Sequence, residues 1–336
     1  MVNWWSTDFD EADAAAVADA VRSRHLSCGP IVREFEERLA EALGVPFVVC
    51  TTSGTTALTL ALAVYGVGAG DEVIVPDRTW IATAHAVMAT GATVRLADVG
   101  ASGLLDDPHR RAPFTIPVNL NGSNATVPAF GLVIEDSCQN FPSPPRGTMA
   151  CYSFSSAKLI PTGQGGAVAT TSEGAYRDLL ALRTHGIANP ESGEAWSRFG
   201  FNFRYTDPQA AIGLVQLRRL KAKVDRLQEI RAIYGASLPP WLTLLPTEGI
   251  PLYTEALHPD PASLIAHLAA HGIQARPFYP LLHTAPYLKP PHKTRYMDYE
   301  FPNANRFAKG LTLPSGPAQT NQAIQRTIEV IHAYQR

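Results

Sequence analysis

The sequence lacks a hydrophobic run long enough to cross a bilayer, which takes about 20 apolar residues. Its most apolar stretch, residues 57–70, is interrupted by Thr59 and by glycines. The first residues show no basic segment followed by an apolar core, so we expect no signal peptide. Cysteine is scarce, and its four residues form no C-x-x-C pair: Cys28, Cys50, Cys138 and Cys151. We therefore expect a cytoplasmic protein with free thiols.

An excess of basic residues is also missing, because 28 Lys and Arg stand against 30 Asp and Glu, for a net charge of −2. This balance argues against a nucleic-acid or membrane-surface partner. The ten histidines show no H-E-x-x-H or paired spacing, so no metal site is predicted. What the chain does have is 336 residues that are 46% apolar and 17% charged. That is enough for one large domain and a smaller one.

Short apolar strands alternate with helical segments through the first half of the chain. We expect helices on both sides of residues 28–30, at 57–65 and at about 80–90. The expected strands are 45–50, 72–75, 93–96, 116–118 and 132–135. Strands and helices that alternate in this way predict an α/β fold with a mixed, mostly parallel sheet.

A long helical pattern over residues 206–234 ends before Pro239-Pro240. The remainder holds an apolar run at 250–253, a helix at 262–270 and a terminal helix after Pro317. We therefore expect a large domain over residues 1–238 and a smaller α+β domain over residues 239–336.

Five local features suggest chemistry. Hydroxyls and a glycine at residues 53–57 open a helix, where backbone N–H groups can bind a phosphate or simply cap the helix. An apolar strand ends in Glu135 and Asp136, the position at which α/β sheets present functional groups. Lys158 stands alone among small residues, and we expect desolvation to lower the pKa of its amine. Trp80 closely follows a strand, and residues 200–211 form a polar, aromatic loop.

Taken together, these motifs resemble the DegT/DnrJ/EryC1/StrS sugar aminotransferase family. They run in the family's order over about residues 28–290: T-S-G-T-T-A-L, G-D-E-V-I-V-P, V-I-E-D-x-x-Q, S-F-S-S-A-K, G-G-A-V, an N-x-R loop and R-P-F-Y-P-L-L-H. The resemblance implies the type I fold of pyridoxal phosphate enzymes, a three-layer sandwich with a smaller C-terminal domain. It also implies pyridoxal 5′-phosphate as cofactor, with pyridoxamine 5′-phosphate as the form between two half-reactions.

The resemblance also implies roles for single residues. Lys158 would form the internal Schiff base with the cofactor. Asp136 would keep the pyridine nitrogen protonated, Gln139 would bond the phenolic oxygen, and Trp80 would stack on the ring.

The family's phosphate ligands match Thr55, Thr56 and Ser153. Asn202 or Arg204 would reach the phosphate in the neighbouring subunit, which implies a homodimer with shared active sites.

Four further residues are weaker candidates. Arg276, Tyr279 and His283 could face the substrate or only pack their segment. His185 could be catalytic, although a histidine beside Gly186 is typical of a helix end. Trp4 and Trp5 are interpreted as packing residues.

The resemblance predicts transfer of an amino group from L-glutamate to a keto group, at C3 or C4, of a nucleotide-linked deoxysugar. Three alternatives remain at this point: a sugar dehydratase that uses pyridoxamine phosphate, an aminotransferase acting on a cyclitol or sugar phosphate, and a non-catalytic sensor. The chain departs from the family by a shortened segment between residues 98 and 136 and by Asn119 and Asn121, where histidine and tyrosine are usual. The latter two could alter substrate contacts.

Overall fold

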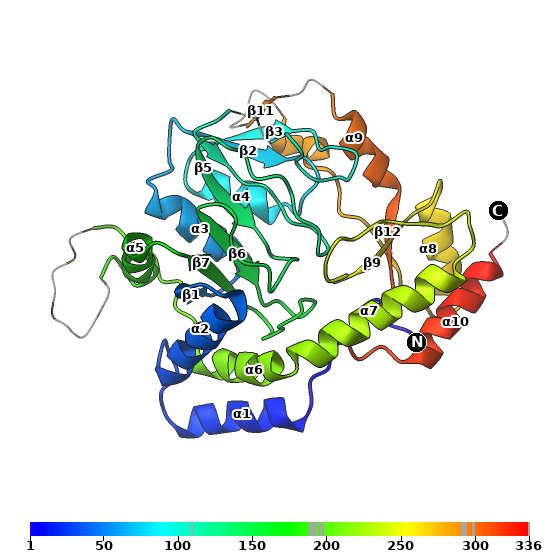
Figure 1. Ribbon diagram of the computed structural model, residues 1–336, viewed down its shortest axis with the longest axis horizontal. Coiled ribbons are helices and arrows are strands. Elements are labelled where there is room, and N and C mark those ends of the chain that lie inside the picture. Colours follow the sequence, from blue (N-terminus) through cyan, green and yellow to red (C-terminus); the bar gives the residue numbers. More distant parts are fainter. Residues whose placement is uncertain are drawn as a thin grey trace.

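The computed structural model describes residues 1–107, 109, 111–187, 193, 196, 198–289, 294–297 and 300–334. The larger of its two sheets has eight strands in the order β1-β7-β6-β5-β4-β2-β3-β11 (Figure 1). These strands are β1 (Phe47–Thr51), β2 (Glu72–Pro76), β3 (Thr93–Ala97), β4 (Phe114–Thr115), β5 (Leu132–Asp136), β6 (Met149–Ser153), β7 (Gly166–Thr170) and β11 (Thr294–Tyr296).

Strand direction follows from the register of the pairs. From β6 through β5, β4, β2 and β3 to β11 every neighbour is parallel, whereas β7 runs antiparallel to both β6 and β1. The predicted mixed, mostly parallel sheet is confirmed. Because carboxyl ends of parallel strands meet at one edge, β2, β5 and β6 bring their following loops together there.

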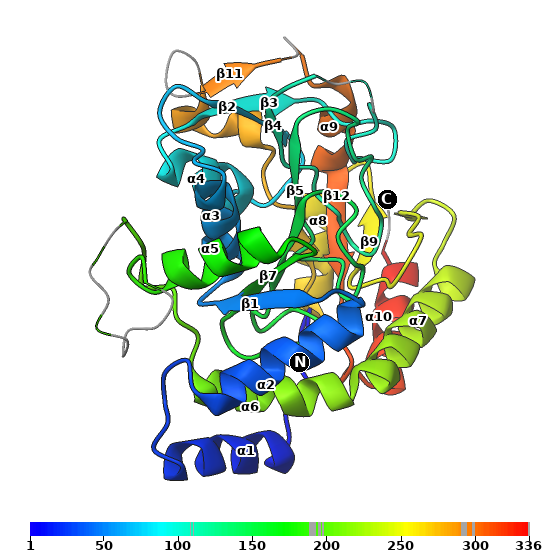
Figure 2. The ribbon, with the colours of Figure 1, turned by 60° about the vertical axis from the view of Figure 1, so that its left-hand side comes forward.

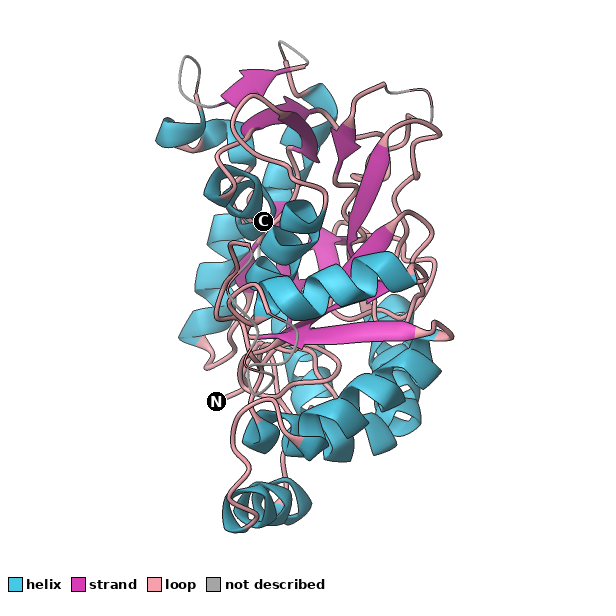
Figure 3. Ribbon diagram, turned by 90° about the vertical axis from the view of Figure 1, so that its left-hand side faces the viewer, coloured by secondary structure: helices cyan, strands magenta, loops and turns pink. Residues whose placement is uncertain are grey.

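Helices cover both faces of the large sheet, which makes three layers. Figure 2 shows α5 and α2 on opposite sides of β1, and Figure 3 shows helices above and below the long strand in the middle. One face packs against α3 (Gly54–Val64), α4 (Ala82–Ala89) and α5 (Glu173–Arg183). The other packs against α2 (Pro30–Leu43) and α6 (Asp207–Arg218), with α1 (Glu11–Arg22) lying outside along α6.

Helix α3 begins earlier than residue 57 because its first turn closes on itself. Ser53 accepts a hydrogen bond from the N–H of Thr56 at 3.1 Å, and the Thr56 hydroxyl accepts one from the N–H of Ser53 at 2.9 Å. This reciprocal cap fixes the helix start at Gly54. The buried helix therefore points its N-terminus at the edge of the sheet where the loops meet.

Two expected elements differ from the structure. Instead of the strand expected at 116–118, the structure has the two-residue strand β4 at 114–115. Pro117 has no N–H to continue the ladder, and of residues 116–118 only Val118 forms a bridge, to Asp136. The helix expected over 206–234 is two helices, α6 and α7 (Leu220–Ser237), which meet at Arg219. The guanidinium of Arg219 bonds Asp8 and the acids that begin α1, a tertiary contact that periodicity does not reveal. Strand β6 and helix α5 had not been anticipated.

The smaller sheet is antiparallel, in the order β10-β12-β9-β8. Its strands are β8 (Thr243–Leu244), β9 (Thr254–Leu257), β10 (Arg276–Pro277) and β12 (Gly310–Leu313). It packs with α7, α8 (Pro261–Ala270) and α10 (Asn321–His332). The remaining short helices are η1 (Leu282–Thr284), η2 (Pro286–Leu288), α9 (Pro302–Arg306) and η3 (Phe307–Lys309).

The two parts of the chain are interleaved around the expected boundary. Helix α7 gives Ile230 and Tyr234 to the core of the smaller part, whereas β11 returns to pair with β3 of the large sheet. The boundary after residue 238 stays a prediction. No described helix is long and apolar enough to cross a membrane.

Candidate active site

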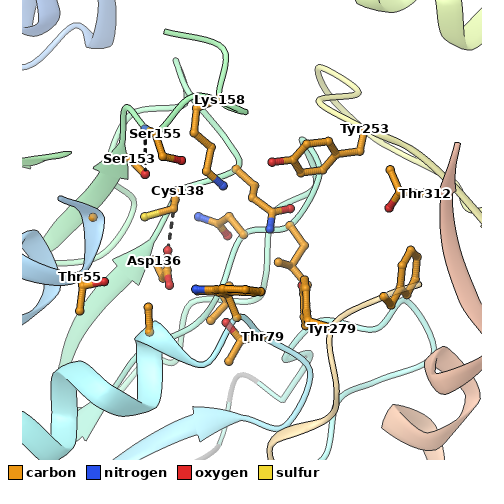
Figure 4. A pocket seen from close by; sticks show the side chains of 18 of the residues that line it. Thr55, Thr79, Asp136, Cys138, Ser153, Ser155, Lys158, Tyr253, Tyr279 and Thr312 are labelled. Atoms are coloured by element: carbon orange, nitrogen blue, oxygen red, sulfur yellow. Dashed lines mark hydrogen bonds between the residues drawn. The ribbon is translucent and has the colours of Figure 1, made fainter. Parts of the chain in front are cut away.

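A cavity of about 460 Å³ opens between the carboxyl edge of the large sheet and the smaller sheet (Figure 4). This volume suits a cofactor-sized ligand. Its wall combines residues expected from the sequence with others that were not. The expected ones are Thr55, Trp80, Asp136, Gln139, Ser153, Lys158, Arg276 and Tyr279.

One end of the cavity is shaped to receive an anion. The first residues of α3, Gly54 and Thr55, line it together with the Ser153 side chain at the end of β6. A Cβ on Gly54 would lie 2.7 Å from Sγ of Cys138 and 3.0 Å from Cβ of Ser153, so only glycine fits there. Free N–H groups and the positive helix end favour a phosphate at this point.

Asp136 and Glu135 end the same strand but turn to opposite sides, as strand geometry requires. Glu135 is buried away from the cavity, where Arg146 holds it at 2.6 Å. Asp136 faces the cavity, and its two oxygens accept hydrogen bonds from the Thr83 hydroxyl at 2.7 Å and the N–H of Cys138 at 3.2 Å. A buried carboxylate oriented in this way can pair with a protonated ring nitrogen.

Lys158 lies five residues past the end of β6, after a turn in which its N–H donates to the carbonyl of Ser155 at 3.0 Å. Figure 4 shows its amine directed into the cavity. Burial lowers the pKa of this amine, but the acidic groups of Tyr253, Cys138 and Asp136 together raise the pKa above its ordinary value. The expectation that desolvation would leave the pKa depressed is therefore wrong.

Trp80 and Tyr279 form an aromatic side of the cavity. Trp80 is 58% exposed, an unusual fraction for such a large apolar side chain. The Tyr279 ring meets it edge-on at 5.9 Å between centroids. Burial raises the pKa of Tyr279. A flat ring bound beside Trp80 would cover its exposed face.

Several residues that line the cavity were not expected from the sequence. Trp4, interpreted as packing, lines the cavity, and the Arg276 guanidinium lies over its ring at 4.1 Å. Glu255 of β9, Tyr253 directly before β9 and Thr312 of β12 also line the cavity. The acid inside the apolar pattern of β9 was the available signal for Glu255.

Other candidates are not among the described residues that line the cavity. The Thr56 hydroxyl serves the α3 cap instead. His283 forms hydrogen bonds with the buried Asp77. His185 is exposed in a turn, and its backbone N–H donates to the carbonyl of Phe201. Asn202 and Arg204 bond each other at 3.0 Å on the loop before α6.

Asn119 and Asn121, which stand where the family usually has histidine and tyrosine, form hydrogen bonds within the scaffold. The amide of Asn119 bonds Glu135, Ser137 and the N–H of Ala125. Asn121 bonds the backbone of Tyr253 through both atoms of its amide.

The residues present fit pyridoxal phosphate. The N-terminus of α3 and Ser153 would hold the phosphate, Asp136 would pair with the ring nitrogen, and Lys158 would supply an amine for the aldehyde. The exposed face of Trp80 offers a surface for the ring. These side chains line one cavity, although they come from α3, β5, β6 and the loops that follow β2 and β6.

Comparisons with known proteins agree with this geometry. The profile of the DegT/DnrJ/EryC1/StrS aminotransferase family matches residues 7–332. A GDP-perosamine synthase from Caulobacter vibrioides is 31% identical, covering 91% of this chain and 90% of that protein. The spore coat polysaccharide biosynthesis protein SpsC from Bacillus subtilis is 28% identical, covering 94% and 92%. A crystal structure of a DegT DnrJ EryC1 StrS aminotransferase from Brucella abortus superposes with a TM-score of 0.87, at 26% identity over 96% of this chain and 95% of that one.

Proposed function

Since this chain belongs to the DegT/DnrJ/EryC1/StrS aminotransferase family and is a pyridoxal-phosphate-dependent aminotransferase, we propose that it aminates a nucleotide-linked keto-deoxysugar. L-Glutamate is the proposed donor, and C3 or C4 of the sugar the proposed position. The observation that carries the proposal is a single cavity in which Lys158 and Asp136 lie beside Trp80 and an anion-binding helix end. The name of the GDP-perosamine synthase relative supports a nucleotide sugar.

Each cavity residue has a physical task in this proposal. When bound, pyridoxal phosphate supplies an aldehyde that takes up the amino group and a ring that withdraws electrons. Lys158 holds the cofactor through its amine, and then moves a proton between the α-carbon of the donor and the cofactor. Asp136 keeps the ring nitrogen protonated by its negative charge.

Other residues hold and orient the cofactor. Thr55 and Ser153 bind the phosphate together with the backbone of α3, and Thr56 acts by fixing the helix cap. Trp80 covers the ring, and Gln139 bonds the phenolic oxygen.

In this proposal the substrates occupy the part of the cavity that Arg276, Tyr279 and Glu255 line. Arg276, exposed over Trp4, carries the positive charge that a donor carboxylate or a nucleotide phosphate needs. Tyr279 and Glu255 offer groups for sugar hydroxyls. A cyclitol or a sugar phosphate would meet the same groups but lacks the nucleotide, so an acceptor panel separates these candidates.

We further propose a homodimer in the cytoplasm, where the four unpaired thiols stay reduced. Asn202 and Arg204 lie on the loop before α6, and in this proposal one of them reaches the phosphate in the neighbouring subunit. Subunit mixing tests it. K158A is inactive by this proposal, and so is R204A or N202A, whichever removes the phosphate contact. A hybrid dimer of K158A with that variant contains one intact site. Random exchange of subunits between K158A and that variant should restore about a quarter of the wild-type activity. If neither R204A nor N202A restores activity when mixed with K158A, the active sites are not shared.

The decisive experiment is the visible spectrum of the protein loaded with pyridoxal phosphate, before and after L-glutamate. A yellow band that L-glutamate bleaches supports both the cofactor linkage and the donor, and K158A should lack that band. A band indifferent to L-glutamate refutes this donor. Turnover with GDP- and dTDP-linked 3-keto- and 4-keto-6-deoxysugars, against a keto-cyclitol and a sugar phosphate, then identifies the acceptor and the position.

A further inference from the structure

Tyr253 lies beside Lys158 in the cavity, although the two residues are far apart in the sequence. Its hydroxyl donates a hydrogen bond to the carbonyl of Ala157 at 2.8 Å, the residue directly before Lys158. Nζ of Lys158 lies 5.9 Å from the centroid of the Tyr253 ring. Figure 4 shows the hydroxyl pointing toward the lysine side chain.

We propose that Tyr253 positions the amine of Lys158 during proton transfer, and that Asn121 and the N-terminal tryptophans hold Tyr253 for that task. This inference rests on the aminotransferase reaction proposed above. An amine that carries a proton between two carbon atoms needs a defined approach, since small misplacements cost large factors in rate.

A phenol suits this task in both protonation states of the lysine. Its oxygen can accept a hydrogen bond from the ammonium while its O–H continues to donate to the Ala157 carbonyl. For the neutral amine, the same proton can turn from the carbonyl to the lysine nitrogen. A hydrogen bond that the ammonium of Lys158 donates to the Tyr253 side chain is among the interactions that raise the pKa of Lys158.

Asn121 fixes the backbone of Tyr253 with one side-chain amide. Its Nδ2 donates to the carbonyl of Tyr253 at 3.0 Å, and its Oδ1 accepts from the N–H of Tyr253 at 2.7 Å. Asn121 has a φ of +49°, in the left-handed region where asparagine is favoured over bulkier residues. An amide that bonds both backbone groups of Tyr253 leaves that residue little freedom to shift.

Two tryptophans fix the ring itself. Trp5 meets it edge-on at 5.5 Å and Trp4 lies at 5.9 Å between centroids. The tryptophan segment is in turn bound to the residues that follow β12, where the N–H of Ser315 donates to the carbonyl of Trp4 at 2.8 Å. The N-terminal residues thus reach the catalytic lysine through a packed aromatic contact.

The test compares Tyr253→Phe with Tyr234→Phe in the protein loaded with pyridoxal phosphate. Both changes remove one hydroxyl that donates to a carbonyl, but Tyr234 bonds Pro314 at 3.0 Å in the core of the smaller part. Two properties are measured: the pH midpoint of the visible band, and the single-turnover rate with L-glutamate. A role that is merely structural would change only thermal stability.

For Tyr253→Phe we expect a rate about 10- to 100-fold lower at an L-glutamate KM within about 2-fold of wild type. The band midpoint should move to lower pH, because a group that favours the protonated nitrogen is gone. Tyr234→Phe should keep both values. Asn121→Ala keeps the Tyr253 hydroxyl but removes the amide that bonds the Tyr253 backbone. This variant should lower the rate by a smaller factor than Tyr253→Phe.

A Tyr253→Phe protein with the wild-type rate and midpoint would overturn the proposal. If L-glutamate fails to react with the wild-type protein, the proposed donor fails. The comparison of band midpoints still decides the role of Tyr253, with an unmoved midpoint counting against it.

Discussion

His283 grips Asp77 with two atoms: its Nδ1 lies 2.7 Å from Oδ2 of the carboxylate, and its backbone N–H donates to Oδ1 at 2.7 Å. Asp77 is fully buried directly after β2, and the His283 ring stacks on Phe301 at 4.7 Å. The pair ties η1 to the loop that carries Trp80. A histidine first considered for substrate contact is therefore bound to the scaffold.

His283→Ala should lower the free energy of unfolding by about 1–3 kcal/mol, because the buried Asp77 loses a hydrogen-bond partner. Urea denaturation measures this. His85→Ala, which removes an exposed histidine bonded to Tyr287, should cost less than about 1 kcal/mol. A large rise in substrate KM with unchanged stability would instead return His283 to the substrate site.

Thr83→Val should weaken binding of pyridoxal phosphate about 10-fold or more, because a hydrogen bond to a charged group contributes about 1.5–3 kcal/mol. The Thr83 hydroxyl is one of two described donors that orient the Asp136 carboxylate. Titration of the protein without cofactor, followed by tryptophan fluorescence, gives the affinity. Thr327→Val removes a buried hydroxyl that donates to the carbonyl of Ala323 within α10; it is the matched control and should bind the cofactor normally.

Glu36→Gln should destabilise the protein by about 3–5 kcal/mol, because it leaves the Arg183 charge buried without its partner. Glu36 and Arg183 lie 2.6 Å apart, with side chains 10% and 6% exposed. The exposed pair Glu173–Arg177 provides the contrast, and Glu173→Gln should change stability by less than about 1 kcal/mol. Equal effects of the two changes in chemical denaturation would contradict the argument.

Glu255→Gln should change how stability depends on pH. Burial raises the pKa of Glu255 despite the nearby Arg78. An acid whose pKa is higher in the folded state binds more protons there, so its contribution is present below its ordinary pKa and is lost as pH rises through the raised value.

The variant lacks this loss. Its unfolding free energy relative to wild type should therefore increase as pH rises from the ordinary glutamate value, about 4.5, through the raised pKa. Denaturation curves at several pH values measure the difference. A difference that stays constant or decreases over this range would show that the pKa of Glu255 is not raised in the folded protein.

The sequence alone determined the alternation of strands and helices and the local chemistry of the cofactor site. Thr55, Asp136 and Lys158 stand in short motifs at strand ends and helix starts, where periodicity and turn residues are informative. A mostly parallel sheet then brings strand ends to one edge, whatever the loops do.

The contacts between residues far apart in the sequence follow from the tertiary structure and not from any local pattern. The N-cap residue of helix α2, Gly29, has no side chain to cap the helix; the carboxylate of Asp207, far along the chain, accepts from the N–H groups of Gly29 and Val32 at 3.0 and 2.8 Å. Trp4 and Tyr253 reach Lys158 in the same way, through packing between segments far apart in sequence. Periodicity reports which face of an element is buried, but not which partner covers it, because that choice depends on how all the elements pack together.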